Sequence, residues 1–229
     1  MNPLRRFLLS SIGRKTMMSL TGLFLILFLV VHLAGNLQLL KPDGGLSFNE
    51  YSHFMSHSLL IQTVSKVNFA FILLHVVYSI WLTREAAAAR PVGYEGKPAK
   101  QTTTWSSRNM GILGTVVFVF LLVHLKGFWY EFKFGELPDY TLPGGEVVPD
   151  AFKVVQAAYS QAWYAGFYVL SMVFLGFHLY HGFQSAWHTL GLSNYKYKPV
   201  IRLVGAAFSV VVPLLFALIP AVMYLRSVG

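Results

Sequence analysis

Residues 16–40 read TMMSLTGLFLILFLVVHLAGNLQLL, and His32 is the only ionisable side chain in this run. At a rise of 1.5 Å per residue, about 20 helical residues cross a bilayer core of about 30 Å, so the run is long enough to span a membrane. The whole chain is 55% hydrophobic and 12% charged, with a mean hydropathy of +0.54. This composition is too apolar for an ordinary soluble domain and predicts a polytopic membrane protein.

Four further stretches have a similar length and composition. The sequence therefore predicts an all-α membrane protein, a bundle of five transmembrane helices at about 16–40, 64–84, 108–130, 160–190 and 200–225. We expect a single transmembrane domain over residues 1–229, because each polar loop is too short to bury a core of its own. A signal peptide is a poorer interpretation of the first stretch, which is too long and has no small-residue cleavage site.

Lysine and arginine are shared unequally between the two sides of the predicted bundle. With the N-terminus in the cytoplasm, six lie outside and twelve lie inside, namely Arg5, Arg6, Arg14, Lys15, Arg84, Arg90, Lys97, Lys100, Arg108, Lys196, Lys198 and Arg202. This bias favours a cytoplasmic N-terminus. A basic inner face suits anionic membrane lipid or a docked protein, and we do not expect nucleic acid as a partner.

The connecting segments carry weaker signals. We expect a short amphipathic helix from Phe48 to Leu60, and an extension of the second helix through its alanine run as far as Pro91. The segment 135–150 is rich in glycine and proline and predicts a loop.

The chain contains no cysteine. This excludes disulfides, thiolate-bound iron–sulfur clusters and covalently attached c-type haem from the chain itself. Any electron-carrying cofactor must then be held by histidine or be bound without a covalent link.

A phrase ending in histidine recurs within the predicted spans: FLVVHL at 28–33, FLLVHL at 120–125 and FLGFHL at 174–179. Each of the first four spans has an interior histidine with phenylalanine four residues earlier, on the same helix face: Phe28 and His32, Phe71 and His75, Phe120 and His124, Phe174 and His178. With 19 phenylalanines the pattern can arise by chance, and one such histidine would fit packing or proton transfer equally well. Four on four helices favour convergence on a shared cofactor, because ionisable groups face the bundle interior.

Depth sorts these four histidines into two levels. His32 and His124 each lie about 16 residues from the inner helix end, at a height of about 24 Å, whereas His75 and His178 lie at about 14 and 18 Å. Two neutral imidazoles at one level are what a six-coordinate haem iron takes from a protein. The sequence predicts two b-type haems about 10 Å apart in height, each with phenylalanine packed against it. Zinc would need three or four ligands at one ion.

The fourth span offers a choice of ligand, because His178, His181 and His188 share one helix face. Height slightly favours His181, and the recurring phrase favours His178. We take His178 as the ligand and His181 as a neighbour on the propionate side of the haem. In the first outer loop, His53 and His57 are expected to be solvated, with a quinone or proton entrance as the alternative.

The segments SLTGLFLILFLVVHL, FAFILLHVVYSIWL, FVFLLVHLKGFW and FLGFHLYHGFQSAWHTLG resemble the b558-type dihaem cytochrome b subunit of succinate:quinone oxidoreductases and fumarate reductases. The resemblance covers all five spans, from about Ser19 to Tyr224, and its most specific parts are TGLF, the four histidines and the step from His178 to Gly182. It implies that the proximal haem iron is held by His75 and His178, and the distal haem iron by His32 and His124.

The resemblance also implies partners and a reaction. Such subunits lie in the bacterial cytoplasmic (inner) membrane and bind a flavoprotein and an iron–sulfur subunit at the cytoplasmic face. Electrons pass from succinate through these partners and both haems to menaquinone, or in reverse when fumarate is reduced. Relatives use an acidic residue near the first outer loop at the quinone site; Glu50 is the nearest match, and a solvated carboxylate is the alternative. Lys15 and Arg84 either pair with haem propionates or anchor helices at headgroups.

Two other functions remain open from the sequence. Histidines in four spans can form the relay of a proton channel or transporter, for which Pro213 and Pro220 are the only mid-membrane helix interruptions. The chain can also be the cytochrome b subunit of another quinone-linked dehydrogenase. The direction of the reaction is not specified by the residues.

Overall fold

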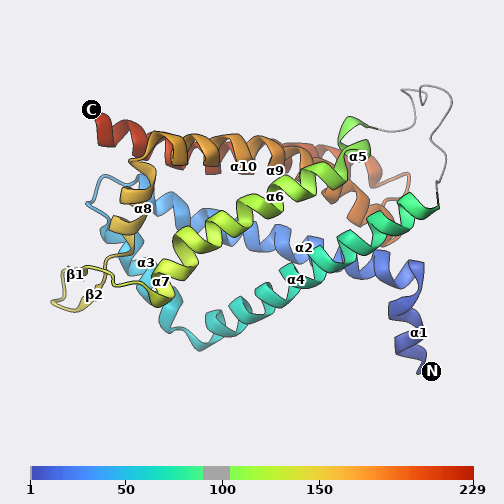
Figure 1. Cartoon of the computed structure of the whole chain (residues 1–229), viewed down its shortest axis with the longest axis horizontal. Helices are drawn as coiled ribbons and strands as arrows, with labels where there is room; N and C mark the ends of the chain where they lie inside the picture. Colours follow the sequence, from blue (N-terminus) through green and yellow to red (C-terminus); the bar gives the residue numbers. More distant parts are fainter. Residues whose placement is uncertain (1, 90–103) are drawn as a thin grey trace.

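The computed structural model describes residues 2–89 and 104–229, which form a bundle of long helices (Figure 1). In chain order the elements are α1 (Pro3–Leu9), α2 (Ser11–Asn36), the 3₁₀ turn η1 (Leu37–Leu40), α3 (Leu46–His57), α4 (Leu59–Ala88), α5 (Trp105–Arg108), α6 (Met110–His124), the π-helical turn η2 (Leu125–Tyr130), α7 (Glu131–Phe134), β1 (Asp139–Thr141), β2 (Val147–Pro149), α8 (Ala151–Tyr159), α9 (Ala162–Thr189) and α10 (Lys198–Val228).

Within the described residues, five helical segments are long and apolar enough to cross a membrane. They are Ser11–Leu40, Leu59–Ala88, Met110–Phe134, Ala162–Thr189 and Lys198–Val228. The predicted five-helix membrane architecture is confirmed, although four of the five segments reach beyond the expected bounds at one or both ends. Polar residues continue these helices past their apolar centres; at the start of α2, for example, the Ser10 hydroxyl accepts a hydrogen bond from the Gly13 amide.

Helix α9 lies at the centre of the packing and contacts α2, α6 and α10, whereas α4 packs mainly along α2. Helices α9 and α10 run side by side over most of their length (Figure 1). Large apolar side chains cover the outside of the bundle, with Leu73, Ile112 and Leu214 each 65% exposed. An outward apolar surface of this kind matches a lipid environment, in which apolar side chains need no further cover.

The two ends of the bundle differ in structure and charge. The end where α2, α6 and α10 begin is called the basic end, because Arg14, Lys15, Arg84, Arg108, Lys196, Lys198 and Arg202 lie in the helix termini and turn there. The opposite end carries η1, α3, α8 and the strands β1 and β2, and is called the hairpin end (Figure 1). Three residues of the predicted inner set, Arg90, Lys97 and Lys100, lie outside the described residues.

The segment predicted as a loop at 135–150 is partly ordered as an antiparallel hairpin, in which Tyr140 pairs with Val148. Gly145 has a φ of 83° in the turn, a conformation that glycine adopts without strain. Helix α8 follows at once, with the Asp150 side chain accepting from the Lys153 amide as its cap. Neither the strands nor α8 was predicted, because single turn residues do not specify which short segments pair across them.

The expected helix between the first two spans is present as α3, but it ends at His57 rather than Leu60. Ser58 has an extended backbone (φ −74°, ψ 118°), and α4 begins directly after it. The alanine run does extend α4, to Ala88. The predicted stop at Pro91 lies outside the described residues.

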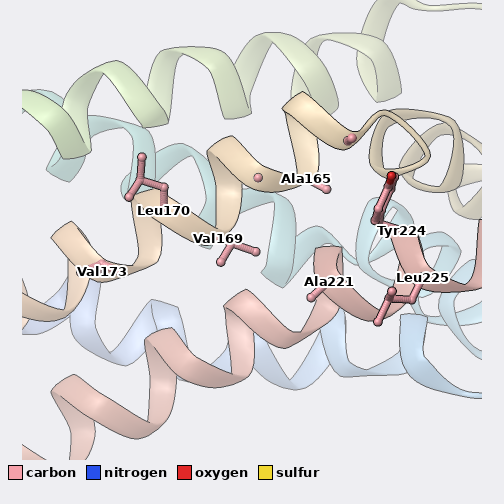
Figure 2. Close-up of a pocket in the computed structure, with 9 residues that line it drawn as sticks. Ala165, Val169, Leu170, Val173, Ala221, Tyr224 and Leu225 are labelled. Atoms are coloured by element: carbon pink, nitrogen blue, oxygen red, sulfur yellow. The ribbon is translucent and has the colours of Figure 1, made fainter.

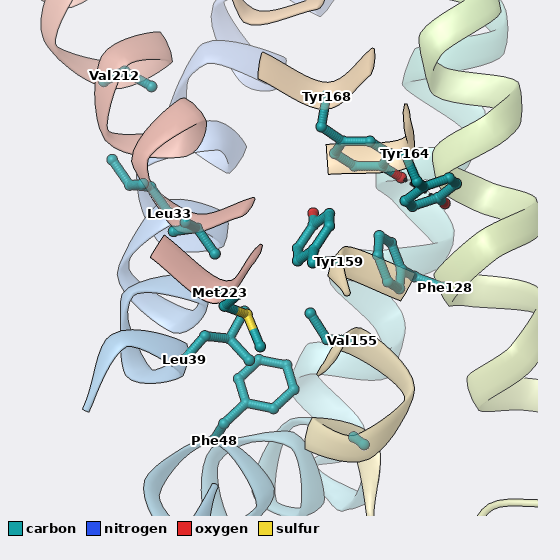
Figure 3. Packing of buried hydrophobic residues seen from close by; sticks show 12 residues of the cluster. Leu33, Leu39, Phe48, Phe128, Val155, Tyr159, Tyr164, Tyr168, Val212 and Met223 are labelled. Atoms are coloured by element: carbon teal, nitrogen blue, oxygen red, sulfur yellow. Dashed lines mark hydrogen bonds between the residues drawn. The ribbon is translucent and has the colours of Figure 1, made fainter. Parts of the chain in front are cut away.

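The hairpin end contains the larger hydrophobic core. Leu39, Phe48, Val155 and Met223, from four different elements, pack beneath an aromatic group that includes Tyr159 (Figure 3). A buried polar contact joins α3 to the start of α8: Asn49 Nδ2 donates to Asp150 Oδ1 over 2.9 Å, and Asn49 Oδ1 accepts from the Phe152 amide over 2.9 Å. Asn49 is completely buried and Asp150 is 5% exposed, so this contact fixes α3 against α8.

Candidate functional site

The four histidines singled out in the spans meet as two pairs. His32 from α2 faces His124 from α6, with ring centroids 5.7 Å apart and ring planes at 88°. His75 from α4 faces His178 from α9, with ring centroids 6.4 Å apart and planes at 62°. We call them the hairpin-side pair and the basic-side pair. The pairs are composed as the depth arithmetic predicted.

Contacts between neighbouring helices give the separation of the two levels. Thr21 touches His75, and His32 lies eleven residues further along α2, which corresponds to about 16 Å. On α9, Tyr168 touches His124, and His178 lies ten residues further on, or about 15 Å. These values exceed the predicted offset of about 10 Å, which was counted from helix ends taken to lie at one height.

Aromatic side chains surround the hairpin-side pair. Phe28 stacks on His32 with centroids 5.2 Å apart, and Phe120 lies 5.8 Å from His124. Phe216 from α10 lies 5.7 Å from His32, and Phe128 lies 5.5 Å from His124. At this pair the phenylalanine one turn before each histidine packs against the imidazole itself, whereas the expected contact of phenylalanine with a haem stays a prediction.

The basic-side pair is built differently. Phe71 packs edge-on against Phe24, with centroids 4.7 Å apart, and among the described rings it makes no contact with His75. Glycines lie beside the imidazoles instead. A Cβ atom added to Gly22 would lie 3.3 Å from His75 Cε1, and one added to Gly114 would lie 3.9 Å from His178 Cε1. Among the described rings, this pair therefore has glycines beside its imidazoles in place of the phenylalanine that precedes each histidine by one turn.

Hydroxyl groups reach one ring of each pair, and the Asn36 amide nitrogen lies 3.4 Å from His32 Nδ1. His75 Nδ1 lies 3.1 Å from Thr21 Oγ1, and His124 Nδ1 lies 3.4 Å from Tyr168 Oη. The buried Nδ1 of His178 has no hydrogen-bond partner. A buried polar atom without a partner is uncommon and indicates either a functional role or a group bound in the native molecule.

The spacing of the pairs suits two imidazoles that share one metal ion. With metal–nitrogen bonds of about 2 Å and centroids about 1 Å behind each nitrogen, two rings on one ion have centroids about 6 Å apart. Both pairs lie close to this value. In residues 2–89 and 104–229, no three His, Cys, Asp or Glu side chains gather as ligands for one metal ion. The arrangement therefore fits a planar cofactor that supplies the remaining ligands itself, as haem does.

The other candidate residues are more exposed. Lys15 and Arg84 lie exposed at the basic end, and Glu50 lies exposed on α3. His181 is partly buried one turn beyond His178 on α9. In the hairpin-end loops, His53 Nε2 lies 3.2 Å from Glu146 Oε1, and the His53 and His57 rings lie 4.2 Å apart.

A partly buried ion pair lies next to the predicted cationic residues. Arg14 is only 7% exposed, donates to Glu85 Oε1 over 2.5 Å and stacks over Trp81 at 4.5 Å. Its Nε is buried without a partner. The sequence reasoning missed this contact, although an acidic residue at the end of a membrane helix opposite an arginine was an available signal. It also missed Thr21 and Tyr168, polar residues inside apolar spans.

An open apolar groove of about 530 Å³ lies between α9 and α10 near the hairpin end (Figure 2). Its lining includes Ala165, Val169, Leu170, Ala221 and Tyr224. Such a surface can take an acyl chain or an isoprenoid tail, and it has no charged group for chemistry. In comparisons with protein-family models, curated proteins and solved structures, nothing matched this chain.

Proposed function

We propose that this chain is the membrane-anchor cytochrome b subunit of a succinate:menaquinone oxidoreductase, with two haem b groups bound by its histidine pairs. It would act as the electron-transfer and quinone-reactive subunit between an iron–sulfur subunit and menaquinone. The observation that carries the proposal is the meeting of four histidines, from four helices, as two facing pairs at separate levels. A bis-imidazole site on separate helices is a recurrent way to hold haem in a helical bundle.

The chain's own residues would bind and orient each haem. His32 and His124 would hold the distal haem iron, and His75 and His178 the proximal one. Each haem, once bound, supplies reversible one-electron transfer at its iron. The apolar and aromatic side chains around the pairs exclude water, and Gly22 and Gly114 leave room for a planar group beside the basic-side rings.

Charge and composition support the proposed partners. The basic end is the natural docking side for a flavoprotein subunit and an iron–sulfur subunit, because its lysines and arginines attract acidic protein surface. The chain has no cysteine, so clusters and covalent thiolate chemistry must belong to another subunit. In this proposal the basic end is cytoplasmic and the membrane is the bacterial cytoplasmic membrane, as the positive-inside rule favours.

Menaquinone would bind at the hairpin end, near the distal haem. Glu50 on α3 remains the proposed carboxylate, and its exposed position leaves it free to meet a head group. The apolar groove between α9 and α10 offers a surface for an isoprenoid tail (Figure 2). Lys15 and Arg84 remain proposed propionate partners, since long cationic side chains at helix ends can turn toward a bound anion.

Haem content and spectra of the purified chain test the proposal. We expect two haems per chain by pyridine haemochrome assay, and we expect His32→Ala and His75→Ala each to remove a different one. A colourless preparation would instead favour the histidine relay of a proton channel or transporter. Haem that is not reduced by succinate, in a complex without covalent flavin, would favour another quinone-linked dehydrogenase.

A further inference from the structure

Two buried hydroxyl groups each approach a histidine of a different pair. Thr21 Oγ1 lies 3.1 Å from His75 Nδ1, and Tyr168 Oη lies 3.4 Å from His124 Nδ1. Thr21 is 1% exposed and Tyr168 is 4% exposed, so neither hydroxyl can exchange this contact for bulk water. Other buried hydroxyls of the spans, Ser171 and Ser209, donate to carbonyls of their own helices.

The two contacts are arranged in the same way along their helices. Helix α2 gives His32 to the hairpin-side pair and Thr21 to the basic-side pair, while α9 gives His178 to the basic-side pair and Tyr168 to the hairpin-side pair. The histidine and the hydroxyl are eleven residues apart on α2 and ten apart on α9. Each of these helices thus contributes to both levels, with an imidazole at one and a hydroxyl at the other.

The hydrogen bonds of Thr21 determine which atom donates. Its hydroxyl has a single hydrogen, and the carbonyl oxygens of Met17 and Met18 accept it at 2.9 and 3.1 Å. When that hydrogen is donated to a carbonyl, the Thr21 oxygen accepts from His75 Nδ1. Nδ1 then carries the proton, and Nε2 keeps the lone pair that a metal ion needs.

Tyr168 is arranged similarly through a second tyrosine. Its hydroxyl lies 3.2 Å from the hydroxyl of Tyr164 and can donate to it, which leaves the Tyr168 oxygen free to accept from His124 Nδ1. Tyr164 reaches this position because residue 127 is glycine: a Cβ there would lie only 2.1 Å from the Tyr164 hydroxyl oxygen. Figure 3 shows Tyr164 and Tyr168 beside Phe128, in the aromatic group of the hairpin end.

We propose that Thr21 and Tyr168 are positioning residues, which hold His75 and His124 in the Nδ1–H tautomer and so direct Nε2 of each ring toward the cofactor. The binding of Nε2 to a metal ion rests on the proposed function, whereas the tautomer of each histidine does not. No hydroxyl described here contacts His32 or His178. Each level then has one ring held by a hydroxyl; of the other two rings, His32 lies 3.4 Å from the Asn36 amide nitrogen and His178 Nδ1 has no partner.

The test compares Thr21→Val and Tyr168→Phe with the unsubstituted chain, because both changes remove a hydroxyl and nearly keep the shape. Thr115→Val is the matched control for Thr21, since the Thr115 hydroxyl is exposed and donates to Gly111 O. Tyr159→Phe is the control for Tyr168; Tyr159 packs on the same aromatic group, and burial raises the pKa of its phenol, which stays neutral. Thr21→Ser keeps the hydroxyl but removes the methyl group, so it separates loss of the hydrogen bond from a general effect of substitution on folding.

The first measurement is the histidine tautomer, by solid-state nitrogen-15 NMR of the labelled full chain in lipid without added haem. We expect Thr21→Val and Tyr168→Phe each to remove one Nδ1–H histidine signal, and Thr21→Ser and both controls to keep it. Unchanged tautomers in Thr21→Val and Tyr168→Phe overturn the inference, whether or not the chain binds haem.

The second measurement is a redox titration of the haem-loaded chain. Loss of a hydrogen bond from Nδ1–H makes a ligand imidazole less electron-donating, so each variant should shift the midpoint potential of one b-type component upward and weaken that haem's binding by about tenfold or more. The two variants should affect different components. A shift of the same component in both contradicts the assignment, whereas a chain without any haem band contradicts the proposed function and leaves the tautomer result to decide.

Discussion

The hairpin-side and basic-side pairs present the same two imidazoles at similar separations, but the surroundings of the rings differ. At the hairpin side, Phe28 and Phe120 lie against His32 and His124. At the basic side, Gly22 and Gly114 stand beside His75 and His178. The imidazoles of one pair pack against large aromatic rings, and those of the other pair pack against glycines. The same ligand chemistry therefore needs bulky neighbours at one level and small neighbours at the other.

This difference predicts that the two pairs respond differently to substitutions that add volume beside the rings. Added volume at Gly22 or Gly114 should disturb the basic-side pair first, because these glycines lie directly beside its rings. Removal of a hydroxyl should affect either pair, since Thr21 and Tyr168 serve one each. The variants below test whether the two halves of the bundle behave independently, beginning with the largest expected effect.

Removal of the fourth histidine ligand should halve the haem content. We expect His178→Ala to lose the basic-side haem and to retain the hairpin-side haem, because His178 is the ring that faces His75. His181→Ala is the matched control, one turn away on the same helix, and should keep both haems. Pyridine haemochrome assay of the purified chains gives the ratio. Loss of a haem in His181→Ala but not in His178→Ala would reverse the assignment on α9.

Filling the space next to His75 should selectively disturb the same haem. A Cβ at Gly22 would already lie 3.3 Å from His75 Cε1, so Gly22→Leu must displace the ring. We expect partial or full loss of the basic-side component in the reduced-minus-oxidised spectrum. Gly166→Leu serves as the control, because a Cβ atom added at Gly166 would have no neighbour within 4 Å. Equal spectra for the two variants would show that the space beside His75 is not needed.

The hairpin end depends on a fully buried polar contact, whereas the Arg14–Glu85 contact at the basic end is partly exposed. Asn49→Ala would leave the buried Asp150 carboxylate without the Asn49 amide and the Phe152 amide without its acceptor. We expect a loss of about 1–3 kcal/mol in the free energy of unfolding, the usual result of an unsatisfied buried polar group. Glu50→Ala, at the adjacent exposed position, should change it by no more than about 0.5 kcal/mol. Denaturant titration in detergent micelles, followed by circular dichroism, measures both.

The five spans and the composition of both pairs were predictable from the sequence, because apolar length and helical rise are properties of the chain itself. The choice between neighbouring polar residues was not. Lys15, Arg84 and Glu50 are exposed, whereas Arg14, Glu85 and Asn49, each one residue away, make the buried or partly buried contacts. One residue rotates a helical side chain by about 100°, so the contact depends on how the helix is turned toward its partners.

Thr21 and Tyr168 illustrate the same limit. Both interrupt apolar spans and were visible as polar residues there, but a hydroxyl in a membrane helix usually bonds to a carbonyl of its own helix. Only the packing of α2 against α4 and of α6 against α9 brings these hydroxyls to His75 and His124. The hairpin and α8 were missed for a related reason, since both pack against α3, and the turn residues do not specify that packing.

At the basic end, the smallest of these effects is expected from Glu85→Ala. The change leaves the Arg14 guanidinium buried over Trp81 without its carboxylate, in addition to an Nε that already has no partner. The Glu85 side chain is 40% exposed, so water can partly replace it, and we expect a loss of only about 1 kcal/mol in the free energy of unfolding. Arg84→Ala, next to it and exposed, should have almost no effect in the same titration. If Glu85→Ala destabilises the chain more than Asn49→Ala does, the tighter polar contact lies at the basic end, and the comparison between the two ends must be reversed.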